Sequence, residues 1–406
     1  MALTTKQITS RIFIAIALLV LVGGYGVAAW LSVPKATVAT TTALTLPKVS
    51  STPIAWPSYG ETALAVNSTS VLITNGDQVP HPIASIAKTI LALALTKQKP
   101  ISADKATPTI TFTDADIAIY KTQLSQNGSV VPIASQEQLS EYQALQALLL
   151  PSGNNIADSL AIWGFGTNDA YLMYANQMVA DMGLTQTHLA DASGYSPQTV
   201  SSARDLVVLG QALMKDPILA EVVGQSTTTL PVAGAVKNVN SLLGKNDIVG
   251  IKTGNTDQAG GCLLFASQGT SANGGATIIG AILGAKDLST VLQDTSKLLE
   301  TNRTNFQPIT VAKAGQTVAT YTTAWGETVH AVTAKDFTVY SPLGTQITTT
   351  ADAQPLKSPA AAGTTVGTLK ATMGSSEETV PLVLSTKLEK PRLLWRLTHP
   401  LALFGK

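Results

Sequence analysis

Residues 81–95 read HPIASIAKTILALAL, which places a serine and a lysine three positions apart at the start of an apolar run. On an α-helix, positions i and i+3 share a face, so the amine of Lys88 can reach the hydroxyl of Ser85. A helix that is apolar on every side is buried, and burial lowers the pKa of a lysine toward that of a useful base. Ser85 would lie near the helix N-terminus, where free N–H groups favour developing negative charge. The stretch therefore predicts a nucleophile for acyl transfer.

The same residues fit a second interpretation without chemistry. A serine can cap a core helix, and a lysine can extend its amine from that helix to solvent. Because Ser-x-x-Lys is common by chance, this stretch alone does not establish a site.

The composition narrows the class of protein. The chain has 406 residues, enough for two or three domains, with 45% hydrophobic residues, 13% charged residues and a net charge of +1. No basic excess indicates nucleic acid as a partner. The single cysteine, Cys262, excludes an internal disulfide and a cysteine metal cluster, and the four histidines show no metal-ligand spacing. We therefore expect neither a cofactor nor a metal.

The N-terminus carries an export signal. Two basic residues precede the uncharged run 12–31, which is long enough to cross a bilayer, and their position leaves the rest of the chain outside the cytoplasm. The length and glycines of residues 1–35 favour a retained transmembrane anchor. The sequence Val-Ala-Ala at 27–29 resembles a cleavage site, so a removed signal peptide stays open. Residues 36–52, rich in Thr, Val and Ala, are expected to form an extended linker.

Two domains and a tail are expected after the linker. Residues 53–304 mix β-prone runs with helical spacing, which predicts an α/β or α+β domain with a central sheet. In residues 305–386 the helical pattern disappears, and short runs broken by Gly, Pro and Asp predict a small all-β domain. Residues 387–406 combine Lys and Arg with Leu, Trp and Phe, the composition of a segment in a membrane interface. The alternative is a tail docked on the β domain.

Individual elements follow from the same patterns. Helices are expected at 138–150, 156–163, 170–182 and 204–214, and strands at 62–66, 70–74, 110–112, 249–251, 262–267 and 276–283.

Two further motifs supply groups for the chemistry predicted at Ser85. Ser-Gly-Asn at 152–154 lies in a loop between two expected helices, and Lys-Thr-Gly at 252–254 follows an expected buried strand. The second motif offers a cation, a hydroxyl, and a glycine that allows close approach of a substrate backbone. Each motif alone is a weak signal. Together, in this order and context, the three are typical of serine acyl-transferases that act on penicillins and peptidoglycan.

With these motifs the chain resembles the D-alanyl-D-alanine carboxypeptidases, the low-molecular-mass penicillin-binding proteins of the serine peptidase type. The resemblance extends over residues 52–384 and includes LLLPSGNN at 148–155 and GIKTGNT at 250–256. It implies a β-lactamase/transpeptidase-like domain with a central antiparallel sheet and helices on both sides, followed by a small β domain. The family usually has an acidic residue where this chain has Asn155, a difference from which we expect little effect. A retained N-terminal anchor is also unusual there, because the family's C-terminal helix holds the membrane.

The resemblance also implies a mechanism. Lys88 takes the proton of Ser85, which attacks the penultimate D-Ala carbonyl and forms an acyl-enzyme that water releases. Ser152 passes a proton to the leaving amine, and Asn154 binds the substrate amide or the Lys88 amine. Lys252 and Thr253 bind the terminal carboxylate, and the N–H groups of Ser85 and Asn255 form an oxyanion hole. The implied catalytic residues are Ser85, Lys88, Ser152 and Asn154, and the implied substrate-binding residues are Lys252, Thr253, Gly254 and Asn255.

The expected function is therefore a carboxypeptidase that removes the terminal D-Ala from peptidoglycan stem pentapeptides on the extracytoplasmic face of the cell membrane, with a role in cell shape and with β-lactams as covalent inhibitors. A class A β-lactamase needs a glutamate for deacylation, and residues 156–219 contain none. An endopeptidase that cuts peptidoglycan cross-links would use the same site. A cell-wall binding protein without activity is the remaining alternative.

Overall fold

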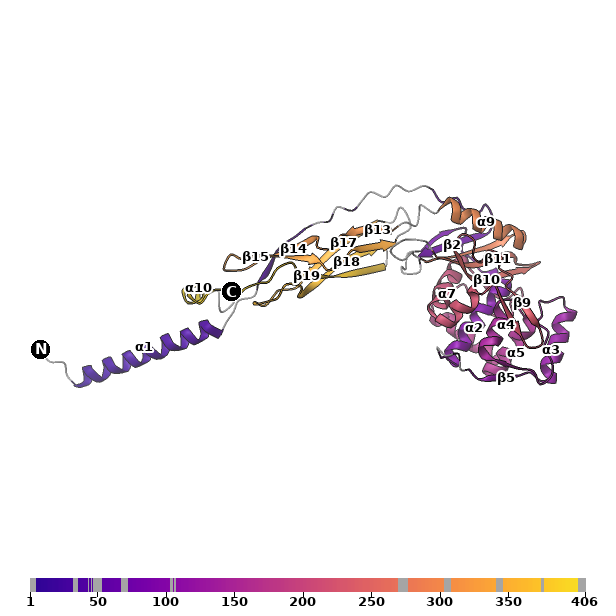
Figure 1. Ribbon diagram of the computed structural model, residues 1–406, viewed down its shortest axis with the longest axis horizontal. Helices are drawn as coiled ribbons and strands as arrows, with labels where there is room; N and C mark the ends of the chain where they lie inside the picture. The colour runs from indigo at the N-terminus through magenta and orange to yellow at the C-terminus, as the bar shows by residue number, and fades with distance from the viewer. Residues whose placement is uncertain are drawn as a thin grey trace. The chain divides into compact units, whose positions relative to one another are not determined.

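The computed structural model describes residues 5–31, 36–42, 44, 46, 53–66, 72–102, 105, 107–268, 277–302, 308–340, 346–373 and 376–400. The chain divides into two compact units (Figure 1). Unit 1 comprises residues 1–48, 308–339 and 345–406, and unit 2 comprises residues 49–307 and 340–344.

Unit 2 is built on a five-stranded antiparallel sheet in the order β10-β11-β12-β2-β3. The sheet places the β-hairpin formed by β2 and β3 at one edge and the strand that carries the Lys-Thr-Gly motif at the other. Its strands are β2 (Glu61–Val66), β3 (Leu72–Asn75), β10 (Ile248–Thr256), β11 (Gly260–Gln268) and β12 (Thr277–Ala285).

Both faces of this sheet are covered, because side chains of successive residues in a strand point to opposite faces. Cys262 and Leu264 of β11 join one hydrophobic cluster, whereas Leu263 and Phe265 join a second. In the second cluster, Val291 and Leu298 of α9 (Leu288–Thr301) pack on the sheet. The remaining helices of unit 2 lie on the other face (Figure 1). An antiparallel sheet between helical layers is the fold class that the resemblance implied, and it is confirmed.

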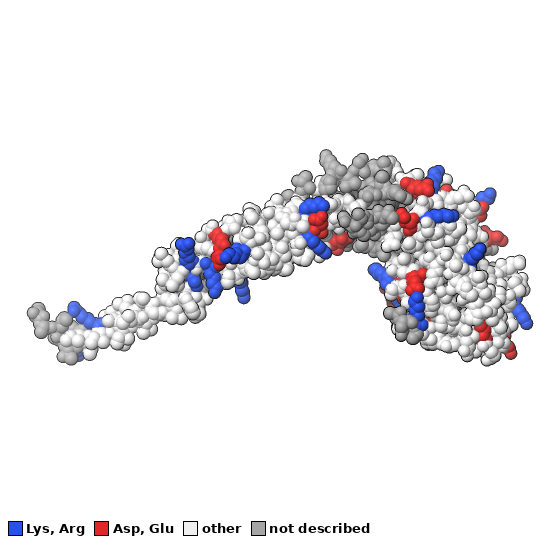
Figure 2. Space-filling model, viewed as in Figure 1, with Lys and Arg blue, Asp and Glu red and all other residues white. Residues whose placement is uncertain are grey.

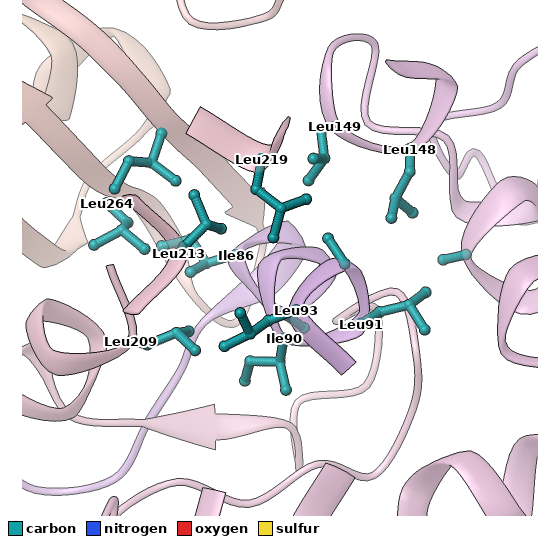
Figure 3. Close-up of a cluster of buried hydrophobic side chains, with 14 of the residues drawn as sticks. Ile86, Ile90, Leu91, Leu93, Leu148, Leu149, Leu209, Leu213, Leu219 and Leu264 are labelled. Atoms are coloured by element: carbon teal, nitrogen blue, oxygen red, sulfur yellow. The ribbon is translucent and has the colours of Figure 1, made fainter. Parts of the chain in front are cut away.

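The helix that follows Ser85 is the centre of the larger cluster. Ten consecutive residues of α2 (Ala87–Gln98), from Ala87 to Thr96, are buried. Figure 3 shows Ile90, Leu91 and Leu93 of this helix surrounded by leucines from other segments. A helix buried on all sides is held at a fixed position, because interiors are close-packed. The sequence prediction of a buried helix is therefore correct.

In its described residues, unit 2 contains further helices and three small strand pairs. The helices are α3 (Asp114–Ser125), α4 (Glu141–Leu149), α5 (Asn154–Phe165), α6 (Asn168–Asp181), α7 (Ala203–Lys215) and α8 (Pro217–Gly224), with a 3₁₀ turn η1 (Ala84–Ile86). The small strand pairs are β4 (His81–Pro82) with β7 (Val200–Ser201), β5 (Thr109–Thr111) with β6 (Gln138–Ser140), and β8 (Thr227–Leu230) with β9 (Gly234–Lys237).

Unit 1 is a β domain with a helix at each end of its sequence. Its six-stranded sheet has the order β1-β14-β15-β19-β18-β17, and β13 pairs with β16. The strands are β1 (Thr37–Thr41), β13 (Pro308–Ala312), β14 (Thr317–Thr322), β15 (Thr328–Thr333), β16 (Phe337–Tyr340), β17 (Ile347–Ala353), β18 (Thr365–Met373) and β19 (Ser376–Leu384), and the helices are α1 (Thr5–Leu31) and α10 (Leu393–Thr398).

The structure differs from the sequence interpretation at several points. Residues 37–41, expected in a linker, form β1 and pair with β14, because Thr and Val, which make up four of these five residues, favour strands. The rest of that expected linker lies largely outside the described residues, as do 70–71 of an expected strand and 401–406 of the tail. Helices α3, α8 and α9 were not predicted. The expected helix at 138–150 begins only at Glu141, because residues 138–140 form β6 and Ser140 caps the helix by accepting from the Gln143 N–H.

Candidate active site

Ser85 lies in the 3₁₀ turn η1, immediately before α2 begins at Ala87. Upstream, the pairing of β4 with β7 and the bond from the Ile83 N–H to the Thr199 carbonyl oxygen (3.2 Å) fix the chain. Ala84 adopts a left-handed conformation with φ of 47°, and its carbonyl oxygen abuts Gly194, where a Cβ would lie 1.8 Å from it. Only glycine fits at position 194, and this contact holds the turn that presents Ser85.

Lys88 is fully buried, and its amine is surrounded by three oxygen atoms. Its Nζ lies 2.9 Å from Ser85 Oγ, 2.7 Å from Asn154 Oδ1 and 2.9 Å from the Ser193 carbonyl oxygen. Burial lowers the pKa of Lys88 from its ordinary 10.5 to about 7, although the charges of Asp191 and Asp158 oppose the shift. A lysine with this pKa is partly neutral at physiological pH and can accept a proton.

The Ser-Gly-Asn motif joins α4 to α5. Ser152 has φ of 67°, a strained conformation for a residue with a side chain, and its Oγ is buried without a hydrogen-bond partner among the residues described. Asn154 is the first residue of α5 and bonds to Lys88. Asn155, which replaces the usual acidic residue of the resemblance, accepts from the Val131 N–H (2.9 Å) and donates to the Val131 carbonyl oxygen (3.0 Å). A carboxylate could make only the first of these bonds.

The Lys-Thr-Gly motif lies on β10. Lys252 and Thr253 are buried, and Lys252 Nζ donates to the Thr253 carbonyl oxygen at 3.1 Å. Burial lowers the pKa of Lys252 well below its ordinary value, and the charge of Lys88 lowers it further. Gly254 faces the turn before α2, since a Cβ there would lie 2.7 Å from the Ile83 carbonyl oxygen. Its hydrogen therefore allows the strand to approach η1, and the expected contact with a substrate backbone stays a prediction.

A cleft of about 510 Å³ opens beside these segments. Ser85, Asn154 and Asn255 line it, so each of the three motif regions contributes a residue to one cavity. The rest of the lining is polar and comes from the segments at 126–129, 194–197 and 256–258. The other motif residues are buried, and each lies within three positions of one of these lining residues in the sequence: Lys88, Ser152, Lys252 and Thr253. A polar cleft with a serine at its wall suits an extended peptide with several hydrogen-bonding groups.

Sequence reasoning did not find several residues that shape this site. The Ser193 carbonyl accepts from Lys88, Gly194 supports the turn at Ala84, and Gln123 of α3 accepts from Asn154 Nδ2 at 3.2 Å. None of them lies in a short motif. Ser193 and Gly194 belong to the loop between α6 and β7, and Gln123 belongs to α3. Within the described ranges, no group of three or more His, Cys, Asp or Glu residues could hold a metal ion.

Comparison with known proteins agrees with this geometry. The family described as D-alanyl-D-alanine carboxypeptidase, peptidase S11, matches residues 58–287, which span all three motifs. The chain belongs to this family. The predicted family, its serine carboxypeptidase class and the expected D-Ala-D-Ala carboxypeptidase activity are thereby confirmed.

Individual relatives give the extent of the similarity. The chain is 26% identical over 278 residues to the D-alanyl-D-alanine carboxypeptidase DacA of Escherichia coli, covering 68% of each chain. It is 29% identical over 225 residues to the carboxypeptidase DacB2 of Mycobacterium tuberculosis, covering 54% of this chain and 72% of that one. The chain is also 29% identical over 210 residues to a D-alanyl-D-alanine endopeptidase of Pseudomonas aeruginosa, covering 49% of this chain and 63% of that one.

Solved structures share the fold. Penicillin-binding protein 5 from Haemophilus influenzae matches with a TM-score of 0.61 at 20% identity, covering 84% of this chain and 99% of that one. The D-alanyl-D-alanine carboxypeptidase DacD from Francisella tularensis matches with a TM-score of 0.57 at 18% identity, covering 87% and 97%. The similarity to both includes more of this chain than unit 2 alone.

Proposed function

We propose that Ser85 is the nucleophile of this carboxypeptidase and that Lys88 is its general base. The observation that carries the proposal is the buried Lys88 amine 2.9 Å from Ser85 Oγ. A buried amine with a pKa of about 7 takes the hydroxyl proton as Ser85 attacks the carbonyl carbon of the penultimate D-Ala. Asn154 and the Ser193 carbonyl hold the amine in place.

The other motif residues receive roles from their positions. The N–H groups of Ser85, in η1, and of Asn255, on β10, lie on segments that line the same cleft and would bind the developing oxyanion. Lys252 and Thr253 would bind the terminal carboxylate of the substrate. Ser152 has an unpartnered Oγ, which suits a hydroxyl that relays a proton to the leaving D-Ala amine. These roles support release of one D-Ala from a peptidoglycan stem pentapeptide.

Covalent labelling tests the nucleophile. We expect a fluorescent penicillin to label the wild-type protein and mass spectrometry to place the adduct on the peptide that contains Ser85. Ser85→Ala should lose the label, whereas Ser289→Ala on the exposed face of α9 should keep it. Labelling of Ser85→Ala at the wild-type rate would show that another residue is the nucleophile.

An endopeptidase is the second candidate, because D-alanyl-D-alanine endopeptidases are among the relatives. The two activities share the site and differ in the leaving group. Purified protein should therefore be offered a stem pentapeptide and a cross-linked dimer in parallel. Free D-Ala from the pentapeptide without loss of the dimer supports the carboxypeptidase, and the reverse result would favour the endopeptidase.

We also propose that α1 is a retained membrane anchor and that α10 lies at the extracytoplasmic surface of the same membrane. Residues 8–31 of α1 are long and apolar enough to cross a membrane by length and composition. The two helices cap each other in unit 1. Arg396 is buried and donates to the carbonyl oxygens of Trp30 (2.9 Å) and Ala29 (3.4 Å), in the last turn of α1. Tyr25 Oη donates to the Leu397 carbonyl oxygen at 2.7 Å.

These hydrogen bonds support retention, because removal of α1 would take two carbonyl acceptors away from the guanidinium of Arg396. Beside it, Leu393, Leu394 and Leu397 are exposed, and Lys390 and Arg392 are exposed as well. Figure 2 shows basic side chains on the part of unit 1 that carries α10. Apolar side chains next to basic ones suit the boundary between lipid head groups and acyl chains.

Intact mass of the exported protein tests the anchor. We expect a mass that includes residues 1–31 and extraction from membranes only by detergent. A mature protein that begins near residue 30 would identify a cleaved signal peptide instead.

A further inference from the structure

A chain of side-chain amides continues from the Lys88 amine into the helical layer. Asn154 accepts from Lys88 and donates through Nδ2 to Gln123 Oε1 at 3.2 Å, and Gln123 Nε2 donates to Asp158 Oδ2 at 2.8 Å. Gln123 lies on α3, whereas Asn154 and Asp158 lie one turn apart on α5. Asn154 and Gln123 are buried, and Asp158 is partly buried.

The carboxylate at the end of this chain determines the direction of every bond in it. An ionised carboxylate only accepts hydrogen bonds, so Gln123 must turn its NH₂ group toward Asp158. The carbonyl oxygen of Gln123 then faces Asn154, and Asn154 must donate to it. Asn154 consequently presents Oδ1, and not Nδ2, to Lys88.

The orientation of the Asn154 amide determines where the lone pair of Lys88 Nζ points. A neutral amine has two N–H bonds and one lone pair, and Lys88 Nζ has the three neighbours Ser85 Oγ, Asn154 Oδ1 and the Ser193 carbonyl oxygen. The last two only accept, so the two N–H bonds go to them and the lone pair faces Ser85 Oγ. If the Asn154 amide were reversed, its NH₂ group would donate to the lone pair and draw it away from Ser85.

We propose that Asp158 is a positioning residue that acts through Gln123 and Asn154 to aim the lone pair of Lys88 at Ser85. The inference rests on the proposed role of Lys88 as the base. In the step that it serves, the Ser85 O–H bond breaks and its proton moves to Nζ. Ser85 Oγ then bonds to the substrate carbonyl carbon, while the electron pair of the C=O π bond moves to the oxygen.

Packing confines the amide pair. A Cβ at Gly128 would lie 2.8 Å from Asn154 Nδ2 and 2.9 Å from Gln123 Oε1, so only a hydrogen fits there. The Gly128 N–H also donates to the Gln123 carbonyl oxygen at 2.9 Å, which fixes this glycine against the pair. The two amides cannot rotate away from each other without moving this loop. The direction that Asp158 imposes is therefore transmitted to Lys88.

Charge and direction can be separated experimentally. The negative charges of Asp191 and Asp158 both raise the pKa of Lys88 against the effect of burial, and Lys252 is a cation that interacts with it. Asp158→Asn removes one of these charges and also lets the residue either donate to or accept from Gln123. Gln123→Leu interrupts the hydrogen bonds between Asn154 and Asp158 but keeps the charge of Asp158.

The experiment measures the rate constant of acylation by a fluorescent penicillin across about pH 5 to 9, calculated per labelled active site so that partial misfolding does not enter. Both variants should reach a maximal rate constant about tenfold below wild type, as expected for one misdirected buried hydrogen bond. In Asp158→Asn the acid limb of the profile should also move to lower pH, because a charge that raises the pKa of Lys88 is lost. In Gln123→Leu the limb should stay.

The matched control is Asp181→Asn on α6, where Gln177 Nε2 donates to Asp181 Oδ1 at 2.7 Å in an exposed pair of the same chemistry. This control should acylate like wild type. Wild-type rate constants in both Asp158→Asn and Gln123→Leu, or an equal loss in Asp181→Asn, would overturn the inference. Failure of the proposed function would look different, since label would then persist in Ser85→Ala.

Discussion

Replacement of Lys88 by methionine tests whether the amine at the centre of the site is neutral in the folded enzyme. The folded-state pKa of Lys88 is about 7, against an ordinary value of 10.5 in an unfolded chain. Between these two pH values the unfolded chain holds a proton that the folded chain lacks. Stability therefore rises with pH over this interval, and the full cost of the buried charge is present below pH 7.

The size of the effect follows from the shift. Each pH unit in this interval adds about 1.4 kcal/mol to the free energy of unfolding. From pH 7 to about 9.5 the wild-type protein should gain about 3 kcal/mol relative to Lys88→Met. The hydrogen bonds and packing that the substitution changes add a constant offset, which does not affect this slope.

Urea unfolding of the full chain in detergent, at several pH values, measures this difference. A hydrogen-exchange pulse at one fixed pH, read out on the α2 peptide, reports the unfolding of unit 2. Lys97→Met removes an exposed lysine from the same helix and serves as the matched control. A difference between wild type and Lys88→Met that stays flat from pH 7 to about 9.5 would mean that Lys88 remains protonated when folded, and would refute its role as base.

Two further predictions concern buried residues of unit 2. Burial raises the pKa of Glu141 from 4.5 to about 7, and neither carboxylate oxygen has a hydrogen-bond partner among the described residues. Glu141→Gln should therefore be more stable than wild type by up to about 3 kcal/mol at pH 8. Because the folded carboxyl binds its proton more tightly, this advantage should disappear as the pH falls to 4.5, and urea titrations at both pH values check it. Gly254→Ala should cost about 1–3 kcal/mol and slow acylation, because its methyl group would lie 2.7 Å from the Ile83 carbonyl oxygen and push β10 away from η1. Wild-type acylation and stability in this variant would show that the strand and the turn move freely.

Local patterns were enough to predict the elements that carry the site. The spacing of Ser85 and Lys88 and the apolar run after them specify a helix with both groups on one face, and the structure places their atoms 2.9 Å apart. The helix expected at 204–214 is α7, which Ser202 caps by accepting from the Asp205 N–H. In contrast, α9 was missed, although its N-terminus carries a capping aspartate, Asp287, that accepts from the Thr290 N–H. A single capping residue is a short signal, and it does not by itself predict a helix.

The sequence by itself determined the three motifs, the buried helix, the all-β character of residues 305–386 and the apolar N-terminal segment, because each depends on residues close together in the chain. Only the tertiary structure decided what surrounds the Lys88 amine. Ser193 and Asn154 contact it from two different segments, and Gln123 of α3 and Asp158 of α5 lie behind Asn154. The contact of α1 with α10 joins residues 366 positions apart, and Gly254 proved to face the η1 turn. Hydrogen bonds between distant segments leave no periodic trace in a sequence, since one suitable side chain or carbonyl at each end is sufficient.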